Sequence, residues 1–230
     1  MNKMTTSSKI LQVLIVAILL STYQVQAESI SEQAELCNAF EKTNIDKSLI
    51  RKMEQAAIYG SLYRIIPASS KVKFGVESFI GFVEAEFHDF DGGIALWHDQ
   101  SEDDGMSMVK VSSYSLDSND AFINDMLKSD VLFNVEQFPD ILFISRHIHW
   151  LDSTSAILQG DLTLHGVTRQ VQFNVQLIVI PGDEFDNMDR VLIEARTTVF
   201  RSDFGMNAYS AFVNDEVQLS MSVEAVRFKG

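Results

Sequence analysis

The chain has 230 residues, of which 32 are acidic and 18 are basic, so its formal net charge is −14. A surface this acidic repels phosphate groups, which argues against nucleic acids and anionic lipid head groups as partners. A single cysteine excludes an intramolecular disulfide, and the length suits one domain with a sizeable core.

Residues 1–27 have the composition of a secretory signal peptide. Lys3 and Lys9 form a positive region, residues 10–20 an apolar stretch, and Val25-Gln26-Ala27 a small-residue cleavage site. The apolar stretch is short for a bilayer span. We therefore expect cleavage after Ala27, export and no stable membrane insertion afterwards, with an uncleaved anchor as the alternative. Cleavage takes the net charge from −14 to −16, because both lysines are lost.

Residues 28–60 are expected to form a helical N-terminal extension. Two sets of apolar residues recur at helical spacing, namely Ile30, Ala34, Cys37 and Phe40, and then Ile45, Leu49, Met53 and Ala57. Thr43 or Asn44 is expected to cap the second helix and Gly60 to end it. The apolar stripe should pack on the rest of the chain with Cys37 inert, although docking of a partner through this extension is an alternative.

Residues 61–230 show the two-residue alternation of β-strands. The pattern predicts strands at 63–66, 71–76, 82–90, 94–97, 106–114, 141–149, 190–201 and 216–227. Asp91-Gly92-Gly93 predicts a turn between two of these strands, and residues 99–105 an acidic loop. Asn119 or Asp120 is expected to cap a helix that ends at Lys128, with its apolar residues on one side.

The clearest hairpin pattern lies between residues 156 and 180. Leu162 and Leu164 alternate with polar residues before a short glycine-containing connection, and the alternation resumes from Val171 through Phe173 and Val175. About eight or nine antiparallel strands with one small helix predict a β-barrel or a β-sandwich. Alternation alone does not separate a barrel, which can enclose a ligand, from a sandwich filled by side chains.

Four ordered blocks of sequence resemble the YceI family of exported, lipocalin-like, polyisoprenoid-binding proteins. The blocks are FVEAEFHDFDGGIAL (82–96), LKSDVLFNVEQFPDILFIS (127–145), GDLTLHGVTRQVQF (160–173) and FRSDFGM (200–206). The resemblance implies an eight-stranded antiparallel lipocalin-like β-barrel with one side helix. It also implies a periplasmic, non-catalytic protein that binds a long isoprenoid or a similar amphiphilic lipid in an apolar cavity.

A ligand of that kind needs apolar side chains on the inward face of the barrel and few polar groups. The expected lining residues are Phe74, Val76, Phe87, Leu162, Leu164, Phe173, Val175, Leu219 and Met221, with Arg201 as a possible contact for a head group. An ordinary solid core is the alternative for the apolar set. For Arg201 we favour a structural role, in which it pairs with Asp203 at a strand end and Gly205 adopts a special backbone shape.

No pattern in the sequence carries catalysis, a metal site or a cofactor. His147 and His149 share one face of a strand, but a solvated face explains them better than a metal site, and Cys37 lacks a histidine nearby in sequence. An exported enzyme acting on a hydrophobic substrate in the same barrel is the alternative, and it would require titratable groups converging inside. The sequence is compatible with a homodimer.

Overall fold

The structure is a computed structural model that describes residues 47–58, 62–96, 105–178 and 190–227. The first set of residues at helical spacing (Ile30, Ala34, Cys37 and Phe40), the caps at Thr43 or Asn44, and Gly60 lie outside the described residues. The described helices and strands, in chain order, are α2 (Lys47–Ile58), β1 (Leu62–Ile65), β2 (Lys71–Ser78), β3 (Gly81–Phe87), β4 (Phe90–Leu96), β5 (Gly105–Ser112), β6 (Leu116–Asp117), α3 (Ala121–Lys128), β7 (Asp140–Trp150), β8 (Ser155–Leu164), β9 (Val167–Ile178), β10 (Arg190–Phe200) and β11 (Val213–Arg227). Short 3-10 turns follow β1 (η1, Pro67–Ser69), β5 (η2, Ser113–Ser115) and β10 (η4, Arg201–Phe204).

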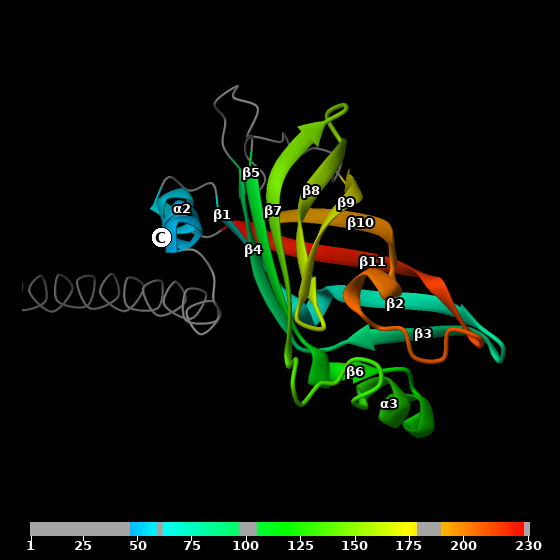
Figure 1. Cartoon of the computed structure of the whole chain (residues 1–230). Helices are drawn as coiled ribbons and strands as arrows, with labels where there is room; N and C mark the ends of the chain where they lie inside the picture. The colour runs from blue at the N-terminus through cyan, green and yellow to red at the C-terminus, as the bar shows by residue number, and fades with distance from the viewer. Residues whose placement is uncertain (1–46, 59–61, 97–104, 179–189, 228–230) are drawn as a thin grey trace, which may run out of the picture.

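The strands close into an antiparallel barrel (Figure 1). The ring runs β1-β4-β5-β7-β8-β9-β10-β11 and returns from β11 to β1, which confirms the predicted eight-stranded antiparallel architecture. β11 is long enough to pair with two strands along one edge: its end pairs with β1, and its earlier part pairs with β2. The hairpin of β2 and β3 therefore extends the barrel beyond β1 and β4, with β6 and α3 beside it (Figure 1).

The predicted turn at Asp91-Gly92-Gly93 is wrong, because β4 runs straight through these residues. Both glycines instead allow close packing. A Cβ on Gly92 would lie 2.5 Å from the carbonyl oxygen of Met108, and a Cβ on Gly93 would lie 3.0 Å from the Met53 methyl group of α2. Glycine is therefore needed here because neighbouring elements pack closely against the strand, and not because the chain turns.

The predicted strand over 82–90 is divided by a break at His88 and Asp89. The main chain at this break is bonded to the 3-10 turn after β5: the His88 amide donates to the carbonyl of Ser115, and the Ser112 amide donates to the carbonyl of Asp89. These bonds pair main-chain groups on both sides of the break, so the chain leaves the regular strand with these groups still hydrogen-bonded.

The hairpin predicted between residues 156 and 180 is formed by β8 and β9. Its two turn residues, His165 and Gly166, have φ angles of 52° and 71°, as in the two-residue turns that match the twist of antiparallel strands. The register pairs Leu162 with Arg169 and Leu164 with Val167. Leu162 belongs to the buried core and Leu164 packs against it, so the apolar residues of β8 face the barrel interior.

The two described α-helices occupy different sides of the barrel. The Asp120 side chain caps α3 by accepting a hydrogen bond from the Ile123 amide at 3.0 Å, as predicted. α2 packs on the outer face of the barrel, where Met53 and Ala56 form a small core with residues of β1, β4 and β5. This packing agrees with the expectation that the apolar stripe of the extension contacts the β domain.

Candidate functional site

One half of the barrel encloses an apolar cavity of about 470 Å³. Its walls come from inward-facing residues of β2, β3, β5 and β7 to β11, from α3, and from the segment between α3 and β7. A volume of this size lies in the range of pockets that hold one small organic ligand. Of the described lining residues, only Lys73, Ser78, Arg201 and Tyr209 carry a side-chain nitrogen or oxygen atom.

The cavity contains nine of the ten residues that the sequence predicts to line it. These are Phe74, Val76, Phe87, Leu162, Leu164, Phe173, Leu219, Met221 and Arg201. Val175 has the predicted inward parity and packs against the core, but it does not line the cavity. Val175 pairs with Ala156 on β8 and with Ala195 on β10, and both alanines are almost fully buried.

The other half of the barrel is a solid core. Buried residues that pack there without lining the cavity include Ile148, Leu158, Leu177, Val191 and Val223. The boundary is visible along single strands, because Met221 lines the cavity whereas Val223 does not, and Phe173 lines it whereas its cross-strand partner Leu158 does not. Cavity and solid core, which the sequence offers as alternatives, therefore occupy different halves of one barrel.

A group of three phenylalanine rings forms part of the cavity wall. Phe74, Phe87 and Phe133 have ring centroids 5.4 to 6.0 Å apart, a spacing typical of favourable aromatic contacts. Phe133 follows α3 and was not identified as a lining residue from the sequence. α3 adds Ile123, Met126 and Leu127 from one face, in keeping with its predicted apolar side. The sequence of α3 alone does not indicate whether its apolar face lines a cavity or packs in a solid core.

The exposed part of the cavity wall comes from the β2–β3 turn, α3 and the loop before β11. Five lining residues here are exposed to solvent, and we call them the mouth: Phe79 (76%), Ile80 (59%), Phe122 (76%), Tyr209 (45%) and Phe212 (56%). Phe79 and Phe212 pack edge to face at 5.5 Å, and the Phe79 amide donates to the Phe212 carbonyl. Turns are seldom this apolar, so the Phe79-Ile80 pair was a signal available in the sequence.

Arg201 borders the cavity but directs its hydrogen bonds to the protein main chain. Its guanidinium donates to the carbonyl oxygens of Met206 (2.5 Å), Ala208 (2.6 Å), Asn214 (2.9 Å) and Val213 (3.1 Å). The favoured structural role therefore agrees with the geometry, but the predicted partner, Asp203, is wrong. A charged side chain only 6% exposed needs such partners, and carbonyls of the following loop supply them.

Other motif residues hold the same corner together. Asp215 accepts hydrogen bonds from the amide and hydroxyl of Ser202, and these bonds lower the pKa of its carboxyl group below the usual value. Gly205 has a φ of 76°, which is the special backbone shape expected of it. His165 donates from Nδ1 to the Phe204 carbonyl at 3.1 Å, and so connects the β8–β9 turn to η4.

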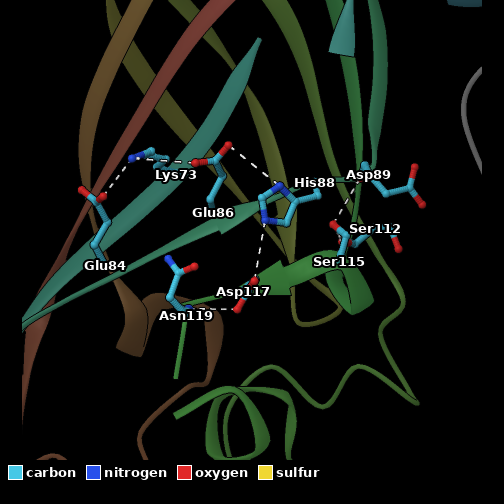
Figure 2. A network of polar contacts seen from close by, with 9 residues as sticks. All are labelled: Lys73, Glu84, Glu86, His88, Asp89, Ser112, Ser115, Asp117 and Asn119. Atoms are coloured by element: carbon cyan, nitrogen blue, oxygen red, sulfur yellow. Dashed lines mark hydrogen bonds and ion pairs between the residues drawn. The ribbon is translucent and has the colours of Figure 1, made fainter. Parts of the chain in front are cut away.

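A polar network lies beside the cavity, on the outside of the barrel where β3 meets β6 (Figure 2). Lys73 bridges Glu84 at 2.9 Å and Glu86 at 3.8 Å, and the hydrogen bond to Glu84 raises the lysine pKa. His88 lies between Glu86 and Asp117, with ring nitrogens 3.9 and 4.0 Å from their carboxylate oxygens. The Lys73 ammonium, although its residue borders the cavity, is thus committed to carboxylates.

The described residues contain no group of three or more histidine, cysteine, aspartate or glutamate side chains arranged to hold a metal ion. His147 and His149 are both exposed on β7. Neither of the two described α-helices has the length and apolar composition needed to cross a membrane.

The fold and site together define a class: closed antiparallel barrels with an internal apolar cavity open at one end. The sequence model of the YceI-like domain matches residues 63–225, and the chain belongs to this family. A UPF0312 protein of Photorhabdus laumondii is 30% identical over 164 residues, covering 67% of this chain and 84% of that protein. A UPF0312 protein of Pseudomonas putida is 30% identical over 148 residues, covering 64% of this chain and 76% of its own length.

Solved structures share the fold. BcnA of Burkholderia cenocepacia superposes with a TM-score of 0.63 at 20% identity, covering 70% of this chain and 99% of that chain. A polyisoprenoid-binding domain from Saccharophagus degradans, implicated in plant cell wall breakdown, superposes with a TM-score of 0.53 at 13% identity. That match covers 72% of this chain and 98% of the domain. At these identities the matches establish the architecture.

Proposed function

We propose that this protein binds a long-chain isoprenoid or a similar amphiphilic lipid in its barrel cavity, without catalysing a reaction on it. The observation that carries the proposal is the apolar cavity of about 470 Å³, open at the mouth and closed by the solid half of the barrel. Its dimensions and lining suit a hydrocarbon chain, because each buried methylene contributes roughly 0.8 kcal/mol and needs no polar partner. The polyisoprenoid-binding domain of Saccharophagus degradans provides a precedent on the same fold.

The chemistry of the lining favours binding over catalysis. The charged residues among the described lining are Lys73 and Arg201, and each directs its donors to protein acceptors, which are carboxylates for Lys73 and main-chain carbonyls for Arg201. A catalytic function would require an acid, base or nucleophile directed at the ligand. Such an arrangement would be visible as titratable groups facing the apolar space, whereas the described walls are aliphatic and aromatic at nearly every position.

The place of action that we propose is the periplasm. Residues 1–27 have the three regions of a cleavable signal peptide, and the YceI family is exported. In that compartment the protein would carry, store or shield a lipid whose hydrocarbon chain is insoluble in water. Transport and storage share the same binding step, so the binding step is the one to test first.

The test compares two tryptophan substitutions at adjacent positions of β11. Leu219 lines the cavity, whereas Gln218 is exposed on the outer face of the same strand. Leu219→Trp should fill part of the cavity and weaken binding of farnesol, a short-chain isoprenoid alcohol, by roughly tenfold or more, because an occupied volume cannot accept ligand. Gln218→Trp should bind farnesol as the wild type does.

Isothermal titration calorimetry measures both affinities, and circular dichroism checks that both variants keep the β-rich fold. Equal farnesol affinity in the wild type and in folded Leu219→Trp would contradict the proposal. So would a complete lack of farnesol and longer prenol binding by the wild-type protein.

A further inference from the structure

The polar side chains that border the cavity differ in whether they already have hydrogen-bond or ion-pair partners within the protein. The Lys73 ammonium binds Glu84 and Glu86, and the Ser78 hydroxyl donates to the Gly81 carbonyl at 2.7 Å. Arg201 donates to four carbonyl oxygens. Among the described residues, the Tyr209 hydroxyl has no hydrogen-bond partner, although it borders the same apolar space.

Tyr209 is also held in an unusual backbone conformation at the mouth. Its φ of 57° lies in the left-handed region, which is uncommon for a bulky residue and is often associated with function. Its carbonyl oxygen accepts hydrogen bonds from the amides of Phe212 (2.8 Å) and Val213 (2.9 Å), which fix the loop in this shape. The loop therefore keeps an aromatic side chain with a polar tip between the apolar cavity and water.

The cations that border the cavity are not available to an anionic head group. The described lining contains two of them, Lys73 and Arg201. Lys73 binds Glu84 and Glu86, and Arg201 is buried among main-chain carbonyls. A phosphate bound here would therefore find no uncommitted cation among the described lining residues.

We propose that the cavity selects an isoprenoid with an uncharged, hydrogen-bonding head group, such as an alcohol. The hydrocarbon tail lies inward, and the head group lies at the mouth in contact with the Tyr209 hydroxyl. This inference rests on the proposed lipid-binding function and adds the class of ligand, its orientation and a specificity residue.

The test uses three ligands that share a hydrocarbon tail: farnesol, farnesyl diphosphate and farnesene, which has no polar head. Equilibrium binding is measured by calorimetry, below the concentrations at which each ligand aggregates. Farnesol should bind roughly tenfold more tightly than farnesyl diphosphate, because the diphosphate loses hydration without finding an uncommitted cation among the described lining residues. Equal or tighter binding of farnesyl diphosphate would overturn the selection of an uncharged head group.

The role of Tyr209 is tested by Tyr209→Phe, which keeps the ring and removes the hydroxyl. This variant should weaken farnesol binding by about fivefold, the typical effect of one hydrogen bond, and should leave farnesene binding unchanged. Tyr114→Phe is the control, because Tyr114 is similarly exposed but bonds Glu136 and does not line the cavity.

Two outcomes would overturn the assignment of Tyr209. If Tyr209→Phe weakens farnesol and farnesene equally, the residue contributes only packing. If it changes neither, the head group lies elsewhere. In either case, binding of farnesene by the wild-type protein would show that the cavity function stands on its own, whereas failure of all three ligands to bind the wild type would contradict the proposed function itself.

Discussion

At the scale of single residues, the position of Arg201 suggests a contact with a ligand, but its hydrogen bonds indicate a structural role. It borders the cavity, yet its guanidinium joins η4 to the loop before β11 through four carbonyl oxygens. That loop carries Tyr209 and Phe212 of the mouth. We expect Arg201 to act on the proposed ligand binding only indirectly, because its hydrogen bonds hold the loop that carries part of the mouth.

Replacing Arg201 should therefore destabilise the whole barrel. Arg201→Met removes the donors and leaves several carbonyls without partners, which should lower the free energy of unfolding by about 3 kcal/mol. Urea denaturation measures the change. Arg196→Met on the preceding strand, β10, is the control. Arg196 is exposed and bonds only Glu194 among the described residues, so its loss should cost less than about 1 kcal/mol. Similar losses for both variants would contradict this role.

Asp117 gives a prediction about pH. Its carboxylate accepts hydrogen bonds from the Asn124 side chain at 2.7 Å and from the Asn119 amide at 2.9 Å, and these bonds lower its pKa below the ordinary 3.8. The ionised form is thus favoured by folding. Its stabilising contribution is complete above pH 3.8 and is lost as the pH falls through the lowered folded pKa.

We expect the free energy of unfolding to decrease as the pH falls below about 4. This decrease should be smaller in Asn124→Ala, because the variant lacks one of the hydrogen bonds that lower the pKa of Asp117. Asn124 anchors α3 to β6, so acid should loosen the wall that this helix contributes. Urea denaturation at several pH values measures both slopes. An unchanged acid dependence in Asn124→Ala would show that the Asp117 contact does not contribute to acid sensitivity.

At the scale of elements, two neighbouring glycines in β4 test how closely the barrel packs. A Cβ at position 92 would lie 2.5 Å from the Met108 carbonyl, a main-chain atom that cannot move without disturbing β5. A Cβ at position 93 would meet first the flexible tip of Met53, at 3.0 Å. Gly92→Ala should therefore cost about 2–3 kcal/mol of unfolding free energy, and Gly93→Ala clearly less.

Thermal or urea unfolding of the two variants gives the comparison. If Gly93→Ala is the more damaging substitution, the contact between α2 and β4 is more rigid than the structure indicates. If neither matters, the close approach of β4 to β5 is not as tight as we describe.

The same glycines show where sequence reasoning fails. Asp91-Gly92-Gly93 has the composition of a hairpin turn, and only the carbonyl of Met108, far away in sequence, explains why glycine is needed within a strand. The break at His88 and Asp89 carries neither glycine nor proline, so the sequence contained no strong signal for it. By contrast, the cap at Asp120 and the β8–β9 hairpin depend on local chemistry, and both were predicted.

Alternation identified the inward face of the barrel but could not locate the cavity along it. Val175 and Phe173 share this face, yet only Phe173 lines the cavity. Whether a position is hollow or filled depends on side chains from strands on the opposite wall, which no single strand encodes. The exposed Phe79 and Ile80 were the one clear sequence signal for the mouth.

At the scale of the whole molecule, a ligand that binds only the folded barrel must stabilise it. Farnesol at about 100 times its dissociation constant should add roughly 2.7 kcal/mol to the free energy of unfolding. For a chain of this size that corresponds to an increase in Tm of about 5–10 °C. Differential scanning calorimetry measures the shift, which should be absent in Leu219→Trp and retained in Gln218→Trp. An equal shift in both variants would place the ligand outside the cavity.

The homodimer suggested by the sequence stays a prediction that the same purified samples can test by light scattering.

The most direct test of lipid binding is the identity of whatever the protein carries in its own cell. The protein should be purified from its native host without detergent, extracted with organic solvent and analysed by mass spectrometry. We predict an amphiphilic lipid of isoprenoid type near one molecule per barrel, depleted in Leu219→Trp and retained in Gln218→Trp. Repeated recovery of the wild-type protein without any lipid, or with the same lipid content in both variants, would contradict the account.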